Sequence, residues 1–473
     1  MSQQWIPKSA QPCPVTEKGP LGWMYKNLFS SPFNTVLTLL GVSLLFWLIT
    51  PLVRWAIIDA TWVGTSRDAC TVLGGCDPGA CWVFIKVRFQ LFMYGFYPEV
   101  ERWRINFAFV LIAFAALPHL IPDFFAKSWR QYLRVALALA LIAAFFGLQP
   151  FLVAAPFFLA PFLLARFSLK ERVVQGRHPI LVGLAASILV CLAVSLSVRA
   201  IWGDGGAWAL GLSAALLVYP LFALKQLSET VWRWNLLCVV YPLIAYFLFV
   251  GDAFGLVLVE THFWGGLFLT LVVAGTGMAT AMPIGILLAL GRCSKMIVIR
   301  TLCIGFIELV RGVPLISVLF MASVMFPLFL PENMSFDKLL RALIGVAFFY
   351  AAYIAEVIRG GLQAIPKGQY EAAEALGWTY WKKMSVIILP QTLRMVIPGL
   401  ANNFLSLLKD TTLVAVIGLL DLLGVAKAAL ADAAWLGFTK EAYVFAGLVF
   451  WIFCFAISRY SNFLEKKYHT NYR

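Results

Sequence analysis

The chain has 473 residues, of which 62% are hydrophobic and 13% are charged, and its formal net charge is +14. This apolar share is well above that of a soluble domain and the charged share is roughly half of it, so an ordinary soluble protein is excluded. A net positive charge can indicate nucleic-acid binding, but Lys and Arg also accumulate in the cytoplasmic loops of membrane proteins. The composition therefore indicates an all-α polytopic membrane protein and disfavours a nucleic-acid partner.

The chain begins with a lysine- and proline-containing stretch, residues 1–32, that we expect to be a short cytoplasmic tail. An apolar run follows at 33–55, and it exceeds the roughly 20 residues that a helix needs to cross a bilayer. No small-residue cleavage pattern comes after it, so we expect this helix to remain as a membrane anchor.

Residues 57–104 form a mixed segment that carries three cysteines, Cys70, Cys76 and Cys81. If the tail is cytoplasmic, this loop is periplasmic, where two of the three thiols can form a disulfide. The spacing does not say which two. A zinc site is the alternative, but no histidine lies nearby.

Six further apolar stretches are predicted to span the membrane, at 105–125, 135–147, 151–165, 180–199, 208–224 and 236–250. The pair within 135–165 is short, so it is either two spans or a re-entrant hairpin around Gln149 and Pro150. Together with 33–55, these stretches predict an N-terminal membrane extension of about seven spans over residues 33–262.

The connecting segments alternate in charge, with Arg166 and Arg172 on one side and Asp204 and Glu260 on the other. The basic side is cytoplasmic by the positive-inside rule. Five more spans are predicted at 263–290, 301–330, 340–361, 391–423 and 443–463, which gives about twelve in total, or about ten with a re-entrant pair. Both termini, including the tail at 466–473, are then cytoplasmic.

Two of these spans carry charged pairs at an (i, i+3) spacing that places both residues on one helix face. Glu308 and Arg311 lie about 10–17 Å along the span 301–330, where a charge costs about 2.5–3.5 kcal/mol and normally faces a partner or a cavity. They either pin two helices as an ion pair or line a substrate path. Glu356 and Arg359 approach the cytoplasmic end of their span, where a gate and ordinary helix-end electrostatics are both possible.

A polar stripe occurs in the span 391–423, at Asn402, Ser406, Lys409, Asp410 and Thr411. The spacing puts Asn402, Ser406 and either Lys409 or Asp410 near one helix face, and such a face in an apolar bundle is expected to point inward. A zwitterionic substrate in a dry cavity needs both donors and acceptors, which this stripe can supply. Hydrogen bonds between helices remain the alternative.

Residues 364–390 form a polar island between two spans. Pro366 and Gly368 begin it, a helix-forming stretch follows, and Gly377 supplies a break, so the pattern predicts helix, turn, helix. The stretch resembles the EAA loop of the permease subunits of bacterial binding-protein-dependent ABC importers. The matching residues are Glu371, Ala372, Ala373, Gly377, Leu389 and Pro390. The resemblance implies that this loop docks on a separate ATPase subunit.

From about residue 263 the chain is similar to the polar and general L-amino acid class of these permeases, through ELVRGVPL at 308–315, YIAEVIRGGL at 353–362 and KDTTL at 409–413. The resemblance implies the type I ABC importer transmembrane fold for residues 263–465, in the bacterial inner membrane. It also implies a second permease subunit, two copies of the cytoplasmic ATPase and a periplasmic amino-acid-binding protein as partners. The extra N-terminal spans resemble those of the enlarged permeases of general L-amino acid importers.

No phosphate-binding loop of the form GxxxxGK[ST] is present, so the resemblance places ATP and Mg²⁺ on the partner ATPase and no cofactor on this chain. The four histidines are not spaced as a metal pair, and we expect no metal site. A secondary transporter is a rival hypothesis, but its expected paired broken helices are not evident in the N-terminal half. A membrane enzyme is a third, without a recognisable catalytic constellation.

Overall fold

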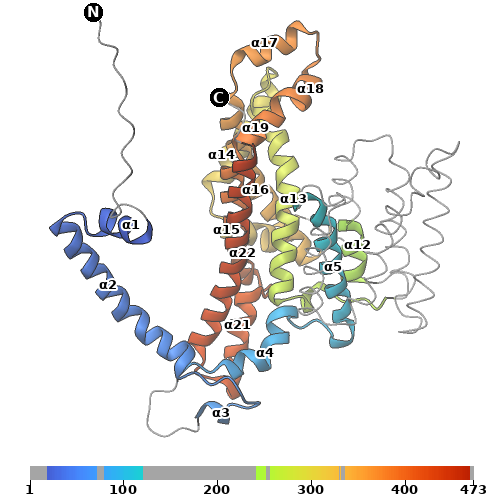
Figure 1. The fold of residues 1–473 in the computed structure, drawn as a ribbon. Helices are drawn as coiled ribbons and strands as arrows, with labels where there is room; N and C mark the ends of the chain where they lie inside the picture. Colours follow the sequence, from blue (N-terminus) through green and yellow to red (C-terminus); the bar gives the residue numbers. More distant parts are fainter. Residues whose placement is uncertain are drawn as a thin grey trace, which may run out of the picture. The chain divides into compact units, whose positions relative to one another are not determined.

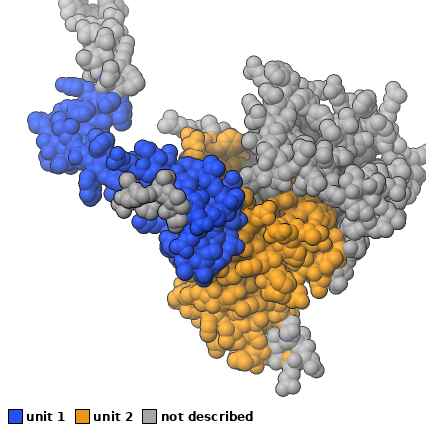
Figure 2. All heavy atoms as spheres, turned by 90° about the horizontal axis from the view of Figure 1, so that it is seen from below, with its two compact units in different colours: residues 1–88, 430–445 blue, residues 89–429, 446–473 orange. Residues whose placement is uncertain are grey.

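The computed structural model describes residues 19–71, 79–120, 241–251, 256–329, 331 and 336–468. Within these ranges every regular element is a helix, which confirms the predicted all-α class (Figure 1). The predicted spans 135–147, 151–165, 180–199 and 208–224 lie outside the described residues, and so does Cys76. Two compact units are distinguished, residues 1–88 with 430–445 and residues 89–429 with 446–473 (Figure 2).

The first unit begins with α1 (Gly19–Leu28) and α2 (Pro32–Val53), which a turn of π-helix continues to Ile58. Ser31 caps α2 by accepting a hydrogen bond from the Asn34 amide at 3.2 Å, and Pro32 occupies the first helical turn, where a missing N–H costs nothing. α2 is long and apolar enough to cross a membrane, and none of its side chains is buried. The helix predicted at 33–55 is confirmed.

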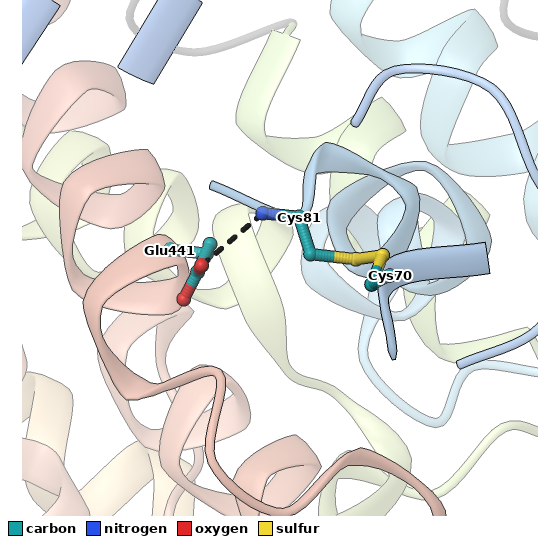
Figure 3. The surroundings of a disulfide bond; sticks show 3 residues. All are labelled: Cys70, Cys81 and Glu441. Carbon is teal, nitrogen blue, oxygen red and sulfur yellow. Dashed lines mark hydrogen bonds between the residues drawn. A yellow bond between two sulfur atoms is a disulfide. The ribbon is translucent and has the colours of Figure 1, made fainter. Parts of the chain in front are cut away.

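The same unit contains α3 (Asp68–Thr71), the first part of α4 (Trp82–Tyr94), a 3-10 turn at Ala433–Trp435 and the start of α22 (Thr439–Tyr468). A disulfide joins Cys70 to Cys81, which settles the pairing that the sequence left open (Figure 3). The buried Cys81 amide donates to the buried Glu441 carboxylate at 3.2 Å. Phe84 packs against Trp435 nearby. Segments 360 residues apart in the sequence therefore share one small core.

The second unit is built around α13 (Gly266–Arg292) and α16 (Lys338–Ala364), which pack along each other. Small residues line the contact: a Cβ placed on Gly285 would lie 2.6 Å from Cγ2 of Ile354, and Ala351 is fully buried. Small side chains let two helix backbones approach closely, as is typical of helix pairs in membranes.

Around this pair lie α5 (Arg102–Leu120) and α12 (Tyr241–Val250), with short 3-10 turns at Glu99–Glu101 and Thr261–Phe263. Buried polar contacts hold their ends. The Tyr97 hydroxyl donates to the Phe249 carbonyl at 3.0 Å, and the Arg104 guanidinium donates to the Val257 carbonyl at 2.7 Å. Burial raises the pKa of Tyr97 to about 12, so this donor stays protonated.

The span predicted as continuous at 301–330 is broken. α14 (Ile297–Gly312) is followed by Val313, whose backbone is extended. α15 (Leu315–Phe320) then leaves at a bend of 105° and leads into short π and 3-10 turns at Met321–Met325 and Phe326–Phe329. The stretch predicted as one straight span is therefore two helices that meet at a sharp break at Gly312–Pro314, and the pair can still count as one bent span. Proline disfavours helical backbone at the residue before it, which is Val313.

The rest of the unit is α17 (Lys367–Ala375), α18 (Tyr380–Lys383), a π turn at Met384–Ile388, α19 (Leu389–Met395), α20 (Ile397–Asp410), a 3-10 helix at Thr411–Ile417 and α21 (Leu422–Leu430). The span predicted at 391–423 is shorter than expected, since the membrane-length helix is Ile397–Ile417. It ends at Gly418, whose φ is +78°. Five described helices can cross a membrane, or six if the bent α14–α15 pair counts as one span.

Candidate functional site

The polar stretch 364–390 is a helix, a turn and a second helix, as predicted, and it lies at one end of the helices of its unit (Figure 1). α17 ends at Ala375 with Leu376 as its cap residue, and Gly377 follows in the left-handed conformation at φ +70°. The Gly377 amide bonds the Glu374 carbonyl at 2.9 Å and the Trp378 amide bonds the Ala373 carbonyl at 3.3 Å. This is the helix termination that glycine favours, because an L side chain there is strained.

Lys383 holds the two arms of this loop together. It is buried, forms an ion pair with Glu374 and lies over the Tyr370 ring at 5.9 Å. The hydrogen bond from Lys383 lowers the pKa of Glu374. The Tyr370 hydroxyl donates to the Leu362 carbonyl at 3.1 Å, so α17 is tied to the last turn of α16.

The residues matched to the EAA pattern differ in exposure. Glu371, Ala372 and Gly377 are exposed, whereas Ala373 is buried. Leu389 and Pro390 are half-buried at the start of α19. Two large apolar side chains, Leu376 and Trp381, are 70% and 65% exposed, which leaves an apolar surface on the outside of the loop.

Glu308 and Arg311 belong to a cluster of five charged side chains from α13, α14 and α16. The Arg292 guanidinium lies 2.8 Å from the Glu308 carboxylate, and Arg311 lies 3.7 Å from Glu356. The pair expected between Glu308 and Arg311 is not among the described ion pairs. Glu308 instead lies beside Arg292, the last residue of α13, because α14 packs there and stops at Gly312. Arg292 was missed by the sequence reasoning, since only helix packing brings it into the cluster.

The stripe on α20 divides into two parts. Asn402, Ser406 and Lys409 share one face, as their spacing predicted, but contrary to our expectation this face is exposed and does not point into the chain's own helices. Asp410 turns to the bundle, where it accepts a hydrogen bond from Tyr350 at 2.5 Å. Thr411 is buried and its hydroxyl bonds the Leu408 carbonyl at 2.8 Å. Across the described ranges, no group of three or more His, Cys, Asp or Glu residues could hold a metal ion.

Comparison with known proteins identifies the family. Residues 281–470 match the model for the binding-protein-dependent transport system inner membrane component. The chain is 43% identical over 448 residues to the inner membrane amino-acid ABC transporter permease protein YhdY of Escherichia coli K12, covering 95% of this chain and 93% of that protein. This chain belongs to the amino-acid ABC transporter permeases. The permease is thus a multi-pass inner membrane protein and a transport subunit.

Other relatives separate into long and short forms. The permease is 38% identical over 473 residues to the glutamate/glutamine/aspartate/asparagine transport system permease protein BztC of Rhodobacter capsulatus, covering 98% and 97% of the two chains. The probable amino-acid ABC transporter permease protein YckA of Bacillus subtilis is 36% identical over 207 residues, 43% of this chain and 87% of its own. A solved structure of an amino acid ABC transporter with histidines matches at 28% identity and a TM-score of 0.38, covering 43% and 92%.

Proposed function

We propose that this permease forms the translocation pathway of an ATP-driven importer of L-amino acids and receives its driving force through residues 364–390. The observation that carries the proposal is the compact loop of α17 and α18. Its arms are fixed internally by Lys383 and Glu374, while Glu371, Leu376 and Trp381 face outward and are free to meet another protein. An apolar patch rimmed by polar groups is typical of a protein contact.

The partners follow from this role. The complex contains a second related permease, two copies of a cytoplasmic ATPase that carries ATP and Mg²⁺, and a periplasmic amino-acid-binding protein. The loop is cytoplasmic under the positive-inside rule, which also places both termini in the cytoplasm. The names of the relatives support amino acids as the substrate class.

The substrate path is proposed to include Asn402, Ser406 and Lys409, which are exposed on one face of α20 although they lie at membrane depth. Glu308 and Arg311 are placed at the end of the path nearest the loop 364–390. Asp410 and Thr411 stabilise the helix that lines the path, because Asp410 accepts a hydrogen bond from Tyr350 and the Thr411 hydroxyl donates to the Leu408 carbonyl. Exposed polar groups in an apolar span are stable only where they meet water, substrate or a partner.

The transport cycle is proposed to follow closure of the ATPases. Their movement pushes α17 and α18, and the helices attached to the loop change between two packed arrangements that open the path to opposite sides. Packed helices switch between discrete states, so a small displacement of the loop is sufficient.

The test is a pull-down of the permease from detergent-solubilised native membrane through a C-terminal tag, with mass spectrometry of the bound proteins. We expect an ATPase and a second permease to co-purify, and both Glu371→Lys and Gly377→Val to lose the ATPase without loss of membrane insertion. At Gly377 the cost comes from the backbone, about 1–2 kcal/mol for a left-handed L residue, because nothing lies within 4 Å of a Cβ placed there.

Gly377→Asn is the matched control, since asparagine tolerates the left-handed conformation and should retain more of the ATPase than valine does. A permease that purifies alone, or an ATPase that stays bound when Glu371 and Gly377 are both altered, would contradict the docking of this loop.

A further inference from the structure

Five charged side chains meet where α13, α14 and α16 come together. Glu356 is the centre of the cluster. Its carboxylate accepts from Arg359 at 2.6 and 3.0 Å, and it lies 3.3 Å from Arg292 and 3.7 Å from Arg311. Glu308 completes the cluster through Arg292 at 2.8 Å.

Glu356 on α16 contacts an arginine from each of the two neighbouring helices. Arg292 ends α13 and Arg311 lies in the last turn of α14, so Glu356 on α16 is the shared acceptor for both neighbours. Glu356 is about one-quarter exposed, whereas Glu308 is about half exposed and contacts Arg292. Removing one member of a half-buried charged group leaves its partners unpaired, which costs more than the loss of a surface pair.

The cluster is joined to the loop by continuous helix. From Glu356 to the end of α16 at Ala364 there are eight residues, about 12 Å at the rise of an α-helix. The Tyr370 hydroxyl fixes α17 to the Leu362 carbonyl within that segment, and Lys383 fixes α18 to Tyr370 and Glu374. A displacement of α17 therefore moves the end of α16 that carries Glu356.

On the other side of the cluster, α14 packs against α13 and α16 but has no straight continuation beyond its last turn. It ends at Gly312, the next residue Val313 is extended, and α15 leaves at 105°, so a tilt of α14 would not carry a straight continuation with it. Its described charged contacts with α13 and α16 run through Glu308 and Arg311.

We propose that Glu356 is a positioning residue that transmits movement of the loop 364–390 to α13 and α14, by holding Arg292 and Arg311 in one arrangement and releasing them in another. The inference rests on the proposed role of the loop. It differs from a purely structural ion pair, which would affect folded yield and leave the coupling between ATP hydrolysis and import unchanged.

The experiment uses the complete complex with its ATPase and binding protein, reconstituted in proteoliposomes and supplied with a mixture of tritiated L-amino acids. The measured quantity is the ratio of amino acid imported to ATP hydrolysed. For Glu356→Gln we expect this ratio to fall at least about fivefold, the lower end of typical coupling between sites, while hydrolysis continues.

Three further variants sharpen the test. Glu308→Gln loses the Arg292 contact alone, so we expect a smaller fall. Glu356→Asp keeps the charge and should recover part of the ratio. Glu465→Gln, on α22 and outside the cluster, should match the wild type.

An unchanged ratio in Glu356→Gln would overturn the proposal, and so would a loss of import and hydrolysis in proportion to folded yield. A different result, the absence of ATP-dependent import by the wild-type complex, would contradict the proposed function itself.

Discussion

Lys382 and Lys383 are neighbours on α18 with opposite surroundings. Lys382 is exposed and lies 5.0 Å from the Trp378 ring centre, whereas Lys383 is buried against Tyr370 and Glu374. We expect Lys383→Met to loosen the loop, measured as faster chymotrypsin cleavage in detergent, and Lys382→Met to leave the rate unchanged. Equal rates for both variants would show that Lys383 does not hold the two arms together.

The ion pair between Lys383 and Glu374 also predicts how the loop responds to pH. The hydrogen bond from Lys383 lowers the pKa of Glu374 in the folded protein. The ion pair therefore contributes fully to the stability of the loop above the ordinary carboxyl pKa of about 4.3, and this contribution is lost as the pH falls through the lowered pKa. The loop therefore keeps this contact throughout the neutral range, and only acid solution should resemble Lys383→Met.

At the scale of elements, the contact between α13 and α16 depends on the absence of side chains. Gly285 and Gly275 lie in the same helix, but a Cβ on Gly285 would meet Ile354 at 2.6 Å and a Cβ on Gly275 would meet nothing within 4 Å. We expect Gly285→Val to lower the free energy of unfolding by about 1–3 kcal/mol through overpacking, visible as a lower Tm in detergent. Gly275→Val is the control, and a similar fall in both would point to helix propensity instead.

Local signals in the sequence indicate several of the helices and the glycine and proline residues at which they end. Gly377 marks the turn between α17 and α18, and the Gly312–Pro314 stretch marks the break after α14, because glycine and proline act on their own backbone. The angle of that break is set by packing, so a continuous span was predicted where the structure bends. The partner of Glu308 was missed for the same reason, since Arg292 reaches it from another helix. The proposed role of the α20 stripe stays a prediction.

At the scale of the whole molecule, α2 is an apolar helix with no buried side chain. We expect a permease in which residues 1–53 are replaced by a cleavable signal peptide to insert and to keep the Tm of the unaltered permease, because none of the α2 side chains that are removed is buried. The π turn after α2 is retained, since the Ala56 carbonyl accepts from the Trp82 indole at 2.8 Å. A fall in Tm or folded yield would show that α2 packs against protein in the membrane.

The contact between Cys81 and Glu441 also has a consequence for the order in which the protein is assembled. The disulfide closes over a separation of 11 residues, but Glu441 is synthesised 360 residues after Cys81, which takes roughly 20–70 s at about 5–20 residues per second. The loop can therefore be oxidised long before its docking partner exists. Its small core is completed only when α22, the last helix that the structure describes, begins to emerge, so a chain truncated before that point would carry a closed but undocked loop.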